Sequence, residues 1–291
     1  KPFRYNLSVG LADNTSEITK FDNPSKILSD YYVGQKLGDI WGYVVDGLFR
    51  TDEEAANYNV DQTAVNFVIN TAQVNPGLHA GDMKFVDLDG DHTISSGSNT
   101  ADDPGDRKII GNSLPRYTYS IQGGFDWYGF DFSIYLQGVG HQDWYPGTNS
   151  VFFWGPYARP YSSFIPRDFL SQVWSPENPD AYFPRPIGYL ALGNNRSLGV
   201  VNDRYLQNLA YCRLKNLSIG YTLPDKWLSK IGFEKIRVYF SGENLLTFTK
   251  LHSDYIDPQQ ASASNSWKTS KSDANIYPWA KTYSFGVDIT F

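Results

Sequence analysis

The sequence has little cysteine, little basic charge and no long hydrophobic run. Cys212 is the only cysteine among 291 residues, which excludes an intramolecular disulfide. The absence of any run of about 18 apolar residues excludes a membrane-spanning helix. The net charge of −6, without a basic cluster, argues against a protein that binds nucleic acid.

The sequence also lacks the short motifs of common enzyme classes. It contains no GxSxG, no phosphate-binding loop and no HExxH. The four histidines show no paired ligand spacing; they are His79, His92, His141 and His252. Carboxylates are plentiful enough for a glycosidase pair, but nothing singles out two acids that would face each other across a cleft. We therefore expect that the protein is not an enzyme, and keep a cell-surface glycan hydrolase as an alternative.

Aromatic residues, at 16%, are abundant and follow a pattern of alternation. From Lys281 to Phe291 every second residue is apolar, and the residues between them are polar or small. Successive side chains of a β-strand point to opposite faces, so this segment predicts a strand with one apolar and one polar face. The apolar series is Tyr283, Phe285, Val287, Ile289 and Phe291.

Five further segments alternate in the same way, and their apolar faces carry aromatic residues near the ends. A single segment of this kind is typical of a half-buried strand in a soluble sheet. Six of them, each about nine to twelve residues long, favour strands that cross a bilayer. We therefore predict an all-β fold, an antiparallel transmembrane β-barrel. The five segments are residues 3–11, 116–127, 130–138, 211–223 and 236–243.

The connections between these segments alternate in length. Residues 128–129 and 224–235 are short, whereas 13–115, 141–210 and 249–280 are long. Bacterial barrels have short periplasmic turns and longer extracellular loops, so every long connection is expected on the outside.

Six strands are too few to close a barrel, because the smallest bacterial barrels use eight. Lys1 and Pro2 lead directly into a strand, without a signal peptide for export. We therefore expect residues 1–291 to be the C-terminal part of a larger barrel domain, with Phe291 as the true C-terminus and the true N-terminus elsewhere.

The long connection 141–210 is rich in aromatic residues and proline. One interpretation is that its rings pack the loop onto itself. The other is that some rings line the ligand path at the mouth and stack on sugars or apolar side chains. The candidates for ligand contact are Trp144, Tyr145, Trp154 and Tyr157.

An acidic loop begins at Asp87 and resembles a calcium-binding loop. Asp87, Asp89 and Asp91 alternate, Thr93 offers a carbonyl at the seventh position, and an apolar residue follows. The EF-hand template requires glycine at position six and glutamate at position twelve, where this chain has histidine and serine. A later acid must therefore complete the shell, and the candidates are Asp102, Asp103 and Asp106. The alternative interpretation is a solvated turn rich in aspartate.

Several longer segments resemble one family. They are GQKLGDIWGYVVDGLFRTDEEA (34–55), GDMKFVDLDGD (81–91), RKIIGNSLPRYTYSIQGGFDWYGFDFSIYLQGVG (107–140), WSPENP (174–179), YCRLKNLSIGYTLP (211–224), IRVYFSGENLLTFTK (236–250) and YPWAKTYSFGVDITF (277–291). In order and over nearly the whole chain, they are similar to the C-terminal part of the SusC/RagA family, the TonB-dependent outer-membrane transporters of Bacteroidetes.

The resemblance implies a 22-stranded barrel, of which this chain supplies about the last six strands with long extracellular loops. The signal peptide, the TonB-interacting segment and the plug would lie outside this sequence. The expected location is the outer membrane, as a multi-pass barrel in contact with lipid. The expected partners are a SusD-like surface lipoprotein and the TonB complex, and the expected substrates are oligosaccharides or peptides.

The resemblance also assigns particular residues. The family's acidic loop falls on Asp87, Asp89 and Asp91, and its closing acid falls on Asp106, which implies Ca²⁺ as the only cofactor. This chain departs from the family pattern in two places. His92 replaces a glycine, and residues 95–105 are an insertion. The family's C-terminal signal for barrel assembly corresponds to Phe291, with Tyr283 and Phe285 on the same face. A rival to import is a secreted, soluble β-rich module that binds glycans.

Overall fold

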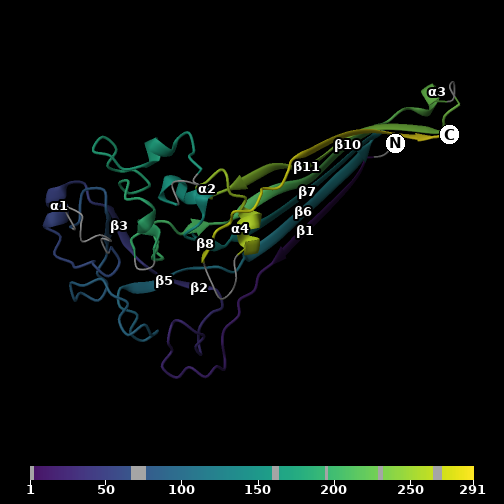
Figure 1. Cartoon of the computed structure of the whole chain (residues 1–291). Helices are drawn as coiled ribbons and strands as arrows, with labels where there is room; N and C mark the ends of the chain where they lie inside the picture. The colour runs from purple at the N-terminus through teal and green to yellow at the C-terminus, as the bar shows by residue number, and fades with distance from the viewer. Residues whose placement is uncertain (1–2, 67–76, 159–163, 194–195, 229–231, 265–270) are drawn as a thin grey trace.

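A six-stranded antiparallel sheet forms one half of the molecule, here called the sheet half (Figure 1). The computed structural model describes residues 3–66, 77–158, 164–193, 196–228, 232–264 and 271–291. Spatial order follows chain order in the sheet, and each strand pairs with the next, which confirms the six predicted strands. The strands are β1 (Arg4–Ala12), β6 (Arg116–Trp127), β7 (Phe130–His141), β10 (Tyr211–Thr222), β11 (Lys235–Thr249) and β13 (Thr282–Thr290).

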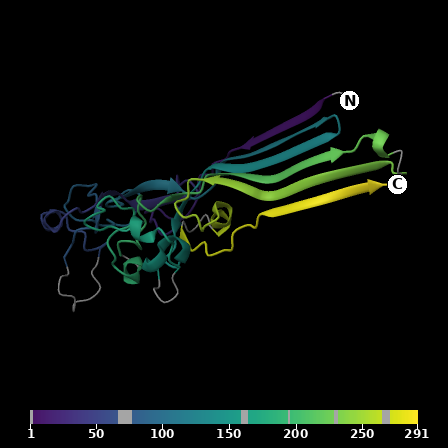
Figure 2. The ribbon, with the colours of Figure 1, turned by 90° about the horizontal axis from the view of Figure 1, so that it is seen from above.

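The connections confirm the predicted alternation of short and long loops. Both chain ends and α3 (Asp225–Leu228) lie at one end of the sheet, and the long connections gather at the other (Figures 1 and 2). Tyr128 and Gly129 join β6 to β7 with φ angles of 47° and 95°. Two consecutive positive φ angles are characteristic of the tight hairpin turn that matches the twist of paired strands.

One face of the sheet is apolar and exposed. Its most exposed side chains include Phe285 at 83% and Tyr5 at 77%, whereas Ile121, Phe125 and Phe132 are half-buried. Aromatic rings contact each other across neighbouring strands, as Phe130 and Tyr221 do with centroids 4.6 Å apart. The sheet is open rather than closed, because β1 and β13 each pair on one side only.

A β-bulge in β10 keeps its two faces in phase with β7. Leu214 pairs with Leu136 and Asn216 pairs with Tyr135, so Lys215 is an extra residue. The extra residue puts Arg213 in register with Gln137, on the polar face. The strict alternation expected from the sequence did not include this change.

The long connections fold into the other half of the molecule, here called the loop half. Its strands form three small sheets and its helices are short. The elements are β2 (Asp39–Tyr43), β3 (Val45–Leu48), α1 (Asp52–Ala56), β4 (Met83–Phe85), β5 (Arg107–Asn112), β8 (Asp143–Pro146), α2 (Val151–Trp154), β9 (Gln207–Asn208), α4 (Pro258–Ser264), β12 (Lys271–Ser272) and the 3-10 helices Gly155–Tyr157, Phe169–Gln172 and Tyr189–Leu192. Within the described ranges no helix has the length and apolar character needed to span a membrane.

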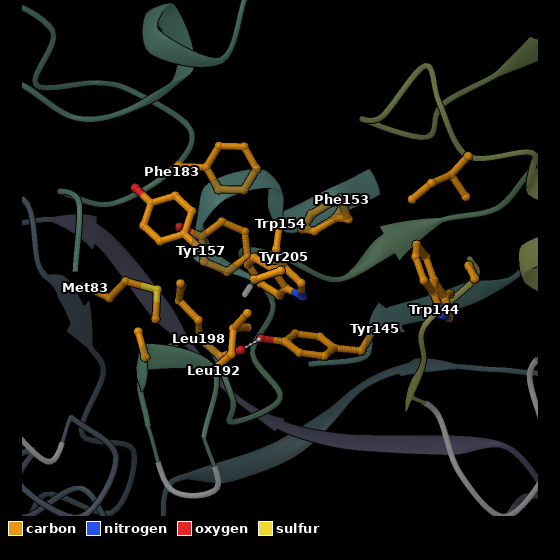
Figure 3. Close-up of a cluster of buried hydrophobic side chains, with 14 of the residues drawn as sticks. Met83, Trp144, Tyr145, Phe153, Trp154, Tyr157, Phe183, Leu192, Leu198 and Tyr205 are labelled. Atoms are coloured by element: carbon orange, nitrogen blue, oxygen red, sulfur yellow. Dashed lines mark hydrogen bonds between the residues drawn. The ribbon is translucent and has the colours of Figure 1, made fainter. Parts of the chain in front are cut away.

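The buried hydrophobic core lies in the loop half and not beneath the sheet. Its centre is a group of aromatic rings from the connection 142–210 (Figure 3). Leu251, Ile256 and Ala261 from the last long connection complete it. The molecule thus joins a compact loop half to a sheet with two solvent-accessible faces.

Candidate functional sites

The structure brings three of the predicted acidic residues together at the edge of the loop half. Asp87 and Asp89 follow β4, and Asp106 immediately precedes β5. One carboxylate oxygen from each lies within 4.8 Å of the other two. Asp106 is fully buried, whereas Asp89 is exposed.

Backbone N–H groups hold these carboxylates in place. Asp87 accepts hydrogen bonds from Gly90 N at 2.7 Å and His92 N at 2.9 Å. Asp106 accepts from Leu88 N and Ser95 N, both at 2.7 Å. Asp106 therefore joins the two ends of the loop that begins at Asp87.

The other two predicted ligands lie differently. Asp91 is outside the group of three, and its carboxylate accepts a hydrogen bond from Thr93 N at 2.7 Å. Thr93 pairs with Asp61 in an isolated bridge, and Ile94 next to it is fully buried as the expected apolar anchor. His92 has φ of 65° and so takes the left-handed conformation that the template gives to glycine.

The electrostatics of the loop suit a cation. Asp89 accepts a hydrogen bond from Asp91 N, which lowers the pKa of its carboxyl, but desolvation and the charges of Asp106, Asp91 and Asp87 together raise that pKa above its usual value. Desolvation works to raise the pKa of Asp87 too, yet its backbone hydrogen bonds keep it below its usual value. Three converging carboxylates are the ligand type that Ca²⁺ prefers.

The four aromatic residues expected at the mouth lie in the core. Trp144 and Trp154 are 0% exposed, Tyr145 is 1% and Tyr157 is 3%. Their polar atoms are satisfied internally: Trp154 Nε1 donates to Gly147 O at 2.9 Å, and Tyr145 Oη donates to Val200 O at 2.8 Å. The structure gives these four rings the packing role that was the other interpretation of this connection (Figure 3).

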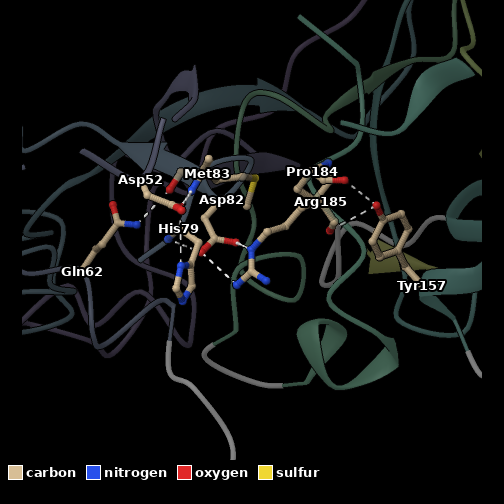
Figure 4. A network of polar contacts seen from close by, with 9 residues as sticks. Asp52, Gln62, His79, Asp82, Met83, Tyr157, Pro184 and Arg185 are labelled. Atoms are coloured by element: carbon tan, nitrogen blue, oxygen red, sulfur yellow. Dashed lines mark hydrogen bonds and ion pairs between the residues drawn. The ribbon is translucent and has the colours of Figure 1, made fainter. Parts of the chain in front are cut away.

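A polar network on the far side of this core joins two long connections (Figure 4). The buried carboxylate of Asp82 pairs with Arg185, with Oδ1 2.6 Å from Nε, and also accepts from His79 N at 2.9 Å. Tyr157 Oη donates to Pro184 O at 2.5 Å next to this pair. Asp82 is buried and Arg185 is 31% exposed, so this partly buried pair fixes geometry more than it adds stability and holds the two connections in register.

Arg213 makes a second ion pair, in which both partners are buried, between the sheet half and the loop half. Its guanidinium is 1% exposed, contacts the carboxylate of Asp257 and donates to Thr247 Oγ1 at 2.9 Å and Gln259 Oε1 at 3.1 Å. Asp257 directly precedes α4, so this pair ties α4 to the end of β10. Sequence reasoning missed both networks, because the two ion pairs join residues 103 and 44 positions apart and no local pattern marks them.

The aromatic residues of β13 are exposed on the apolar face. Tyr283 is 61% exposed and Phe285 is 83%. Phe291, which follows the strand, is 82% exposed and contacts Phe233 with ring centroids 5.4 Å apart. This exposure leaves the three rings available to lipid or to another protein.

The fold is similar to part of a solved β-barrel protein. A solved structure of the RagAB peptide transporter matches with a TM-score of 0.59 and 17% identity over 99% of this chain and 27% of that one. Its "closed-closed" state gives a TM-score of 0.56. These likenesses confirm the antiparallel barrel-type fold.

Relatives in sequence have the same kind of name. TonB-dependent receptor P3 of Formosa agariphila is 29% identical over 265 residues, which cover 89% of this chain and 22% of the relative. The TonB-dependent receptor SusC of Bacteroides thetaiotaomicron is 24% identical over the whole chain and 25% of its own length. No family model matches. The chain is therefore related to SusC-type TonB-dependent receptors over most of its length, and it spans about a quarter of the relatives it matches.

Proposed function

We propose that this chain is part of the transmembrane barrel of an outer-membrane, TonB-dependent importer of oligosaccharides or peptides. The observation that carries the proposal is the exposed apolar face of the sheet, which continues across all six strands. The strands β1 and β13 have nine residues each, which lies within the usual length of a tilted transmembrane β-strand, about 9–11 residues.

The open edges of the sheet support a larger barrel. In hydrocarbon each unpaired backbone group costs several kcal/mol, so β1 and β13 need further strands beside them. We propose that residues 1–291 are a C-terminal part of a 22-stranded, multi-pass barrel domain. The plug, the TonB-interacting segment and the signal peptide then belong to other parts of the protein.

The loop half is the proposed extracellular mouth and partner surface. All long connections gather at one end of the sheet, opposite the short turns, as in bacterial barrels (Figure 1). One relative is SusC, and the similar solved structure is named a peptide transporter. By this likeness we infer a SusD-like lipoprotein as partner, the TonB complex as the source of energy, and oligosaccharides or peptides as substrates.

We also propose that Asp87, Asp89 and Asp106 hold a calcium ion. None of the ion pairs among the described residues involves Asp106, although it is a fully buried carboxylate. A buried charge needs a counter-charge, and a bound cation would supply it. The ion would join β4 to β5 and so stabilise the loop half.

The exposed rings of β13 support a role in assembly. Tyr283, Phe285 and Phe291, with Val287 and Ile289 between them, present an exposed apolar strip on this face. We propose that the machinery that inserts barrels into the outer membrane binds this strip before the strand meets lipid.

Membrane fractionation and uptake test the main proposal against the soluble glycan-binding alternative. The full-length protein should remain in the outer-membrane fraction after carbonate washing, and folded protein should migrate differently from heated protein in gels. Uptake of its substrate should stop when TonB is deleted. Release by carbonate, or uptake that continues without TonB, would contradict the proposal.

A further inference from the structure

The loop half contains a polar cleft that lies outside the acidic loop and the aromatic core. Its volume is about 350 Å³, near the lower limit of ligand-binding pockets. The cleft lies between the segment 28–41 and the segment 99–113. We propose that this cleft binds one neutral sugar ring. The inference rests on the import function proposed above and assigns a carbohydrate substrate to the importer. The lining residues used below are Ser29, Tyr31, Asp39, Trp41, Asn99 and Arg107.

One wall of the cleft is built by the insertion at residues 95–105. Leu28 N donates to Asn99 O at 2.9 Å, and Ala101 N donates to Lys26 O at 3.0 Å. Lys26 Nζ pairs with Asp102 Oδ1 at 2.8 Å beside these bonds. The insertion therefore has a structural purpose apart from the acidic loop, because it closes this cleft against the segment 26–31.

The opposite wall is a rigid two-stranded sheet. β2 pairs with β5, and Trp41 is in register with Ile109. Asp39, at the start of β2, accepts a hydrogen bond from Asn112 Nδ2 at 3.0 Å. Side chains on paired strands hold their positions better than side chains on loops, so the cleft is largely formed before a ligand arrives.

Arg107 supplies fixed hydrogen-bond donors. Its guanidinium donates to Ser96 O at 2.9 Å, Asn99 Oδ1 at 3.0 Å and Pro104 O at 3.1 Å. No carboxylate of the described residues forms an ion pair with it. The cleft thus contains a guanidinium and the Asp39 carboxylate that are not paired with each other.

Hydroxyl groups suit this arrangement, because each can donate to a carboxylate and accept from a guanidinium or an amide. Tyr31 and Trp41 are half-buried and add amphipathic aromatic surface. A sugar ring has the same two properties, since its hydroxyls are polar and its C–H faces are apolar.

A charged ligand fits less well. Arg107 already donates to three oxygens through Nε and Nη2, so only the two N–H groups of Nη1 remain. One of them can donate to a hydroxyl, but a carboxylate that binds through two neighbouring nitrogens would have to displace an existing bond. A charged amine would meet Asp39 next to Arg107 and lose water on entering the cleft. A neutral ring avoids both costs, which is why a peptide terminus is the less favoured ligand.

The test uses the intact transporter that contains this chain, purified in detergent. The probes are methyl α-D-glucopyranoside, methyl β-D-galactopyranoside and methyl β-D-xylopyranoside, with glycylglycine as the peptide probe. Saturation-transfer NMR measures their binding to the unaltered protein and to Trp41→Ala, Asn99→Ala and Ser29→Phe. Ser29 is exposed at the cleft, so phenylalanine there fills the space without altering the core.

The matched control is Trp227→Ala, which removes an exposed tryptophan on α3 at the far end of the molecule. We expect at least one sugar to bind with a dissociation constant on the order of 1 mM. The three cleft variants should weaken binding about tenfold or more, and the control should leave it unchanged. If Trp41→Ala fails to fold, the other two cleft variants decide.

Three outcomes would overturn the inference. They are equal sugar binding by all variants, no binding of any sugar probe, and binding of glycylglycine with the same dependence on the cleft variants. The last would assign the cleft to a peptide. Each of these outcomes leaves the import proposal intact, because TonB-dependent uptake is measured separately.

Discussion

Arg237 on β11 pairs with Asp131 on β7 across Gly220 of the strand between them. Its Nη2 lies 2.6 Å from Asp131 Oδ2 and its Nε lies 2.9 Å from Oδ1. A Cβ atom at Gly220 would lie 2.5 Å from Asp131 Oδ1 and 2.6 Å from Arg237 Nε. Glycine is therefore the residue that lets this ion pair cross the polar face of the sheet.

The first prediction is that Gly220→Ala breaks this ion pair. The added methyl group would displace both side chains, at a cost of about 1–3 kcal/mol. The folding free energy of the barrel, measured by urea titration in lipid vesicles, should fall by that amount. Gly123→Ala is the control, because a Cβ there meets Ile134 at an ordinary 3.5 Å. Equal losses in the two variants would contradict the prediction.

The second prediction concerns the two faces of β7. Phe132 belongs to the apolar face and Ser133 to the polar face, where it pairs with Ser218. Phe132→Lys puts a charge in hydrocarbon and should cost about 2–4 kcal/mol near the midplane. Ser133→Lys should cost far less. The folded fraction in outer membranes measures both, and comparable losses would mean that the faces are assigned the wrong way round.

The third prediction concerns calcium. Titration with calcium should raise the melting temperature of the intact protein, and a chelator should reverse the effect, because an ion that binds only the folded state stabilises it. Asp106→Asn should weaken binding about tenfold or more, since it removes the buried ligand. Asp91→Asn is the control, because Asp91 lies outside the group of three carboxylates. Calorimetry that finds no binding at millimolar calcium would exclude the site.

The fourth prediction concerns pH. The imidazole of His252 stacks on Tyr182 with ring centroids 3.7 Å apart and an interplanar angle of 20°. Burial lowers the pKa of His252, and the nearby carboxylates of Asp168 and Asp254 only partly offset this. The unfolded chain, with a pKa of 6.5, therefore binds a proton more readily than the folded one.

The neutral, buried His252 therefore contributes its full share of the folding free energy above pH 6.5. That contribution is lost as the pH falls from 6.5 towards the lowered pKa of His252. Thermal unfolding followed by tryptophan fluorescence should show a lower melting temperature in that window. His252→Phe keeps a stacking ring but cannot titrate, so its melting temperature should vary less with pH. An unchanged slope in that variant would contradict the prediction.

Alternation predicted the sheet half well, because each strand has one apolar and one polar face. The six strands, their order of short and long connections and the exposed apolar face all follow from this period of two. The open sheet also follows, since six strands are too few for closure. The bulge at Lys215 escaped prediction, because it depends on pairing with β7 and not on the local sequence of β10.

The loop half was much less predictable. Its core depends on contacts between residues far apart in sequence, such as Asp82 with Arg185. Local spacing indicated that Asp87 and Asp89 could meet a cation and left Asp102, Asp103 and Asp106 as candidates for the closing acid. The family resemblance then selected Asp106. The same sequence pattern offered Asp91, which the fold turns toward Thr93 instead. The polar cleft has no local motif, because the insertion at 95–105 meets the segment 26–31 only after folding.

The bulge at Lys215 makes the faces of β10 depend on whether its number of residues is odd or even. Between Lys215 and Thr222, the apolar face carries Leu217, Ile219 and Tyr221. Between Tyr211 and Lys215, Leu214 lies on the apolar face and Arg213 on the polar face. Loss of one residue between 216 and 222 would turn the part of the strand near Tyr211 by half a turn and carry the charge of Arg213 to the apolar face, away from Asp257. Loss of Lys215 itself would keep every side chain on its present face. The effect of a deletion in β10 therefore depends on where it falls and on whether it removes an odd or an even number of residues. The number of residues removed matters less.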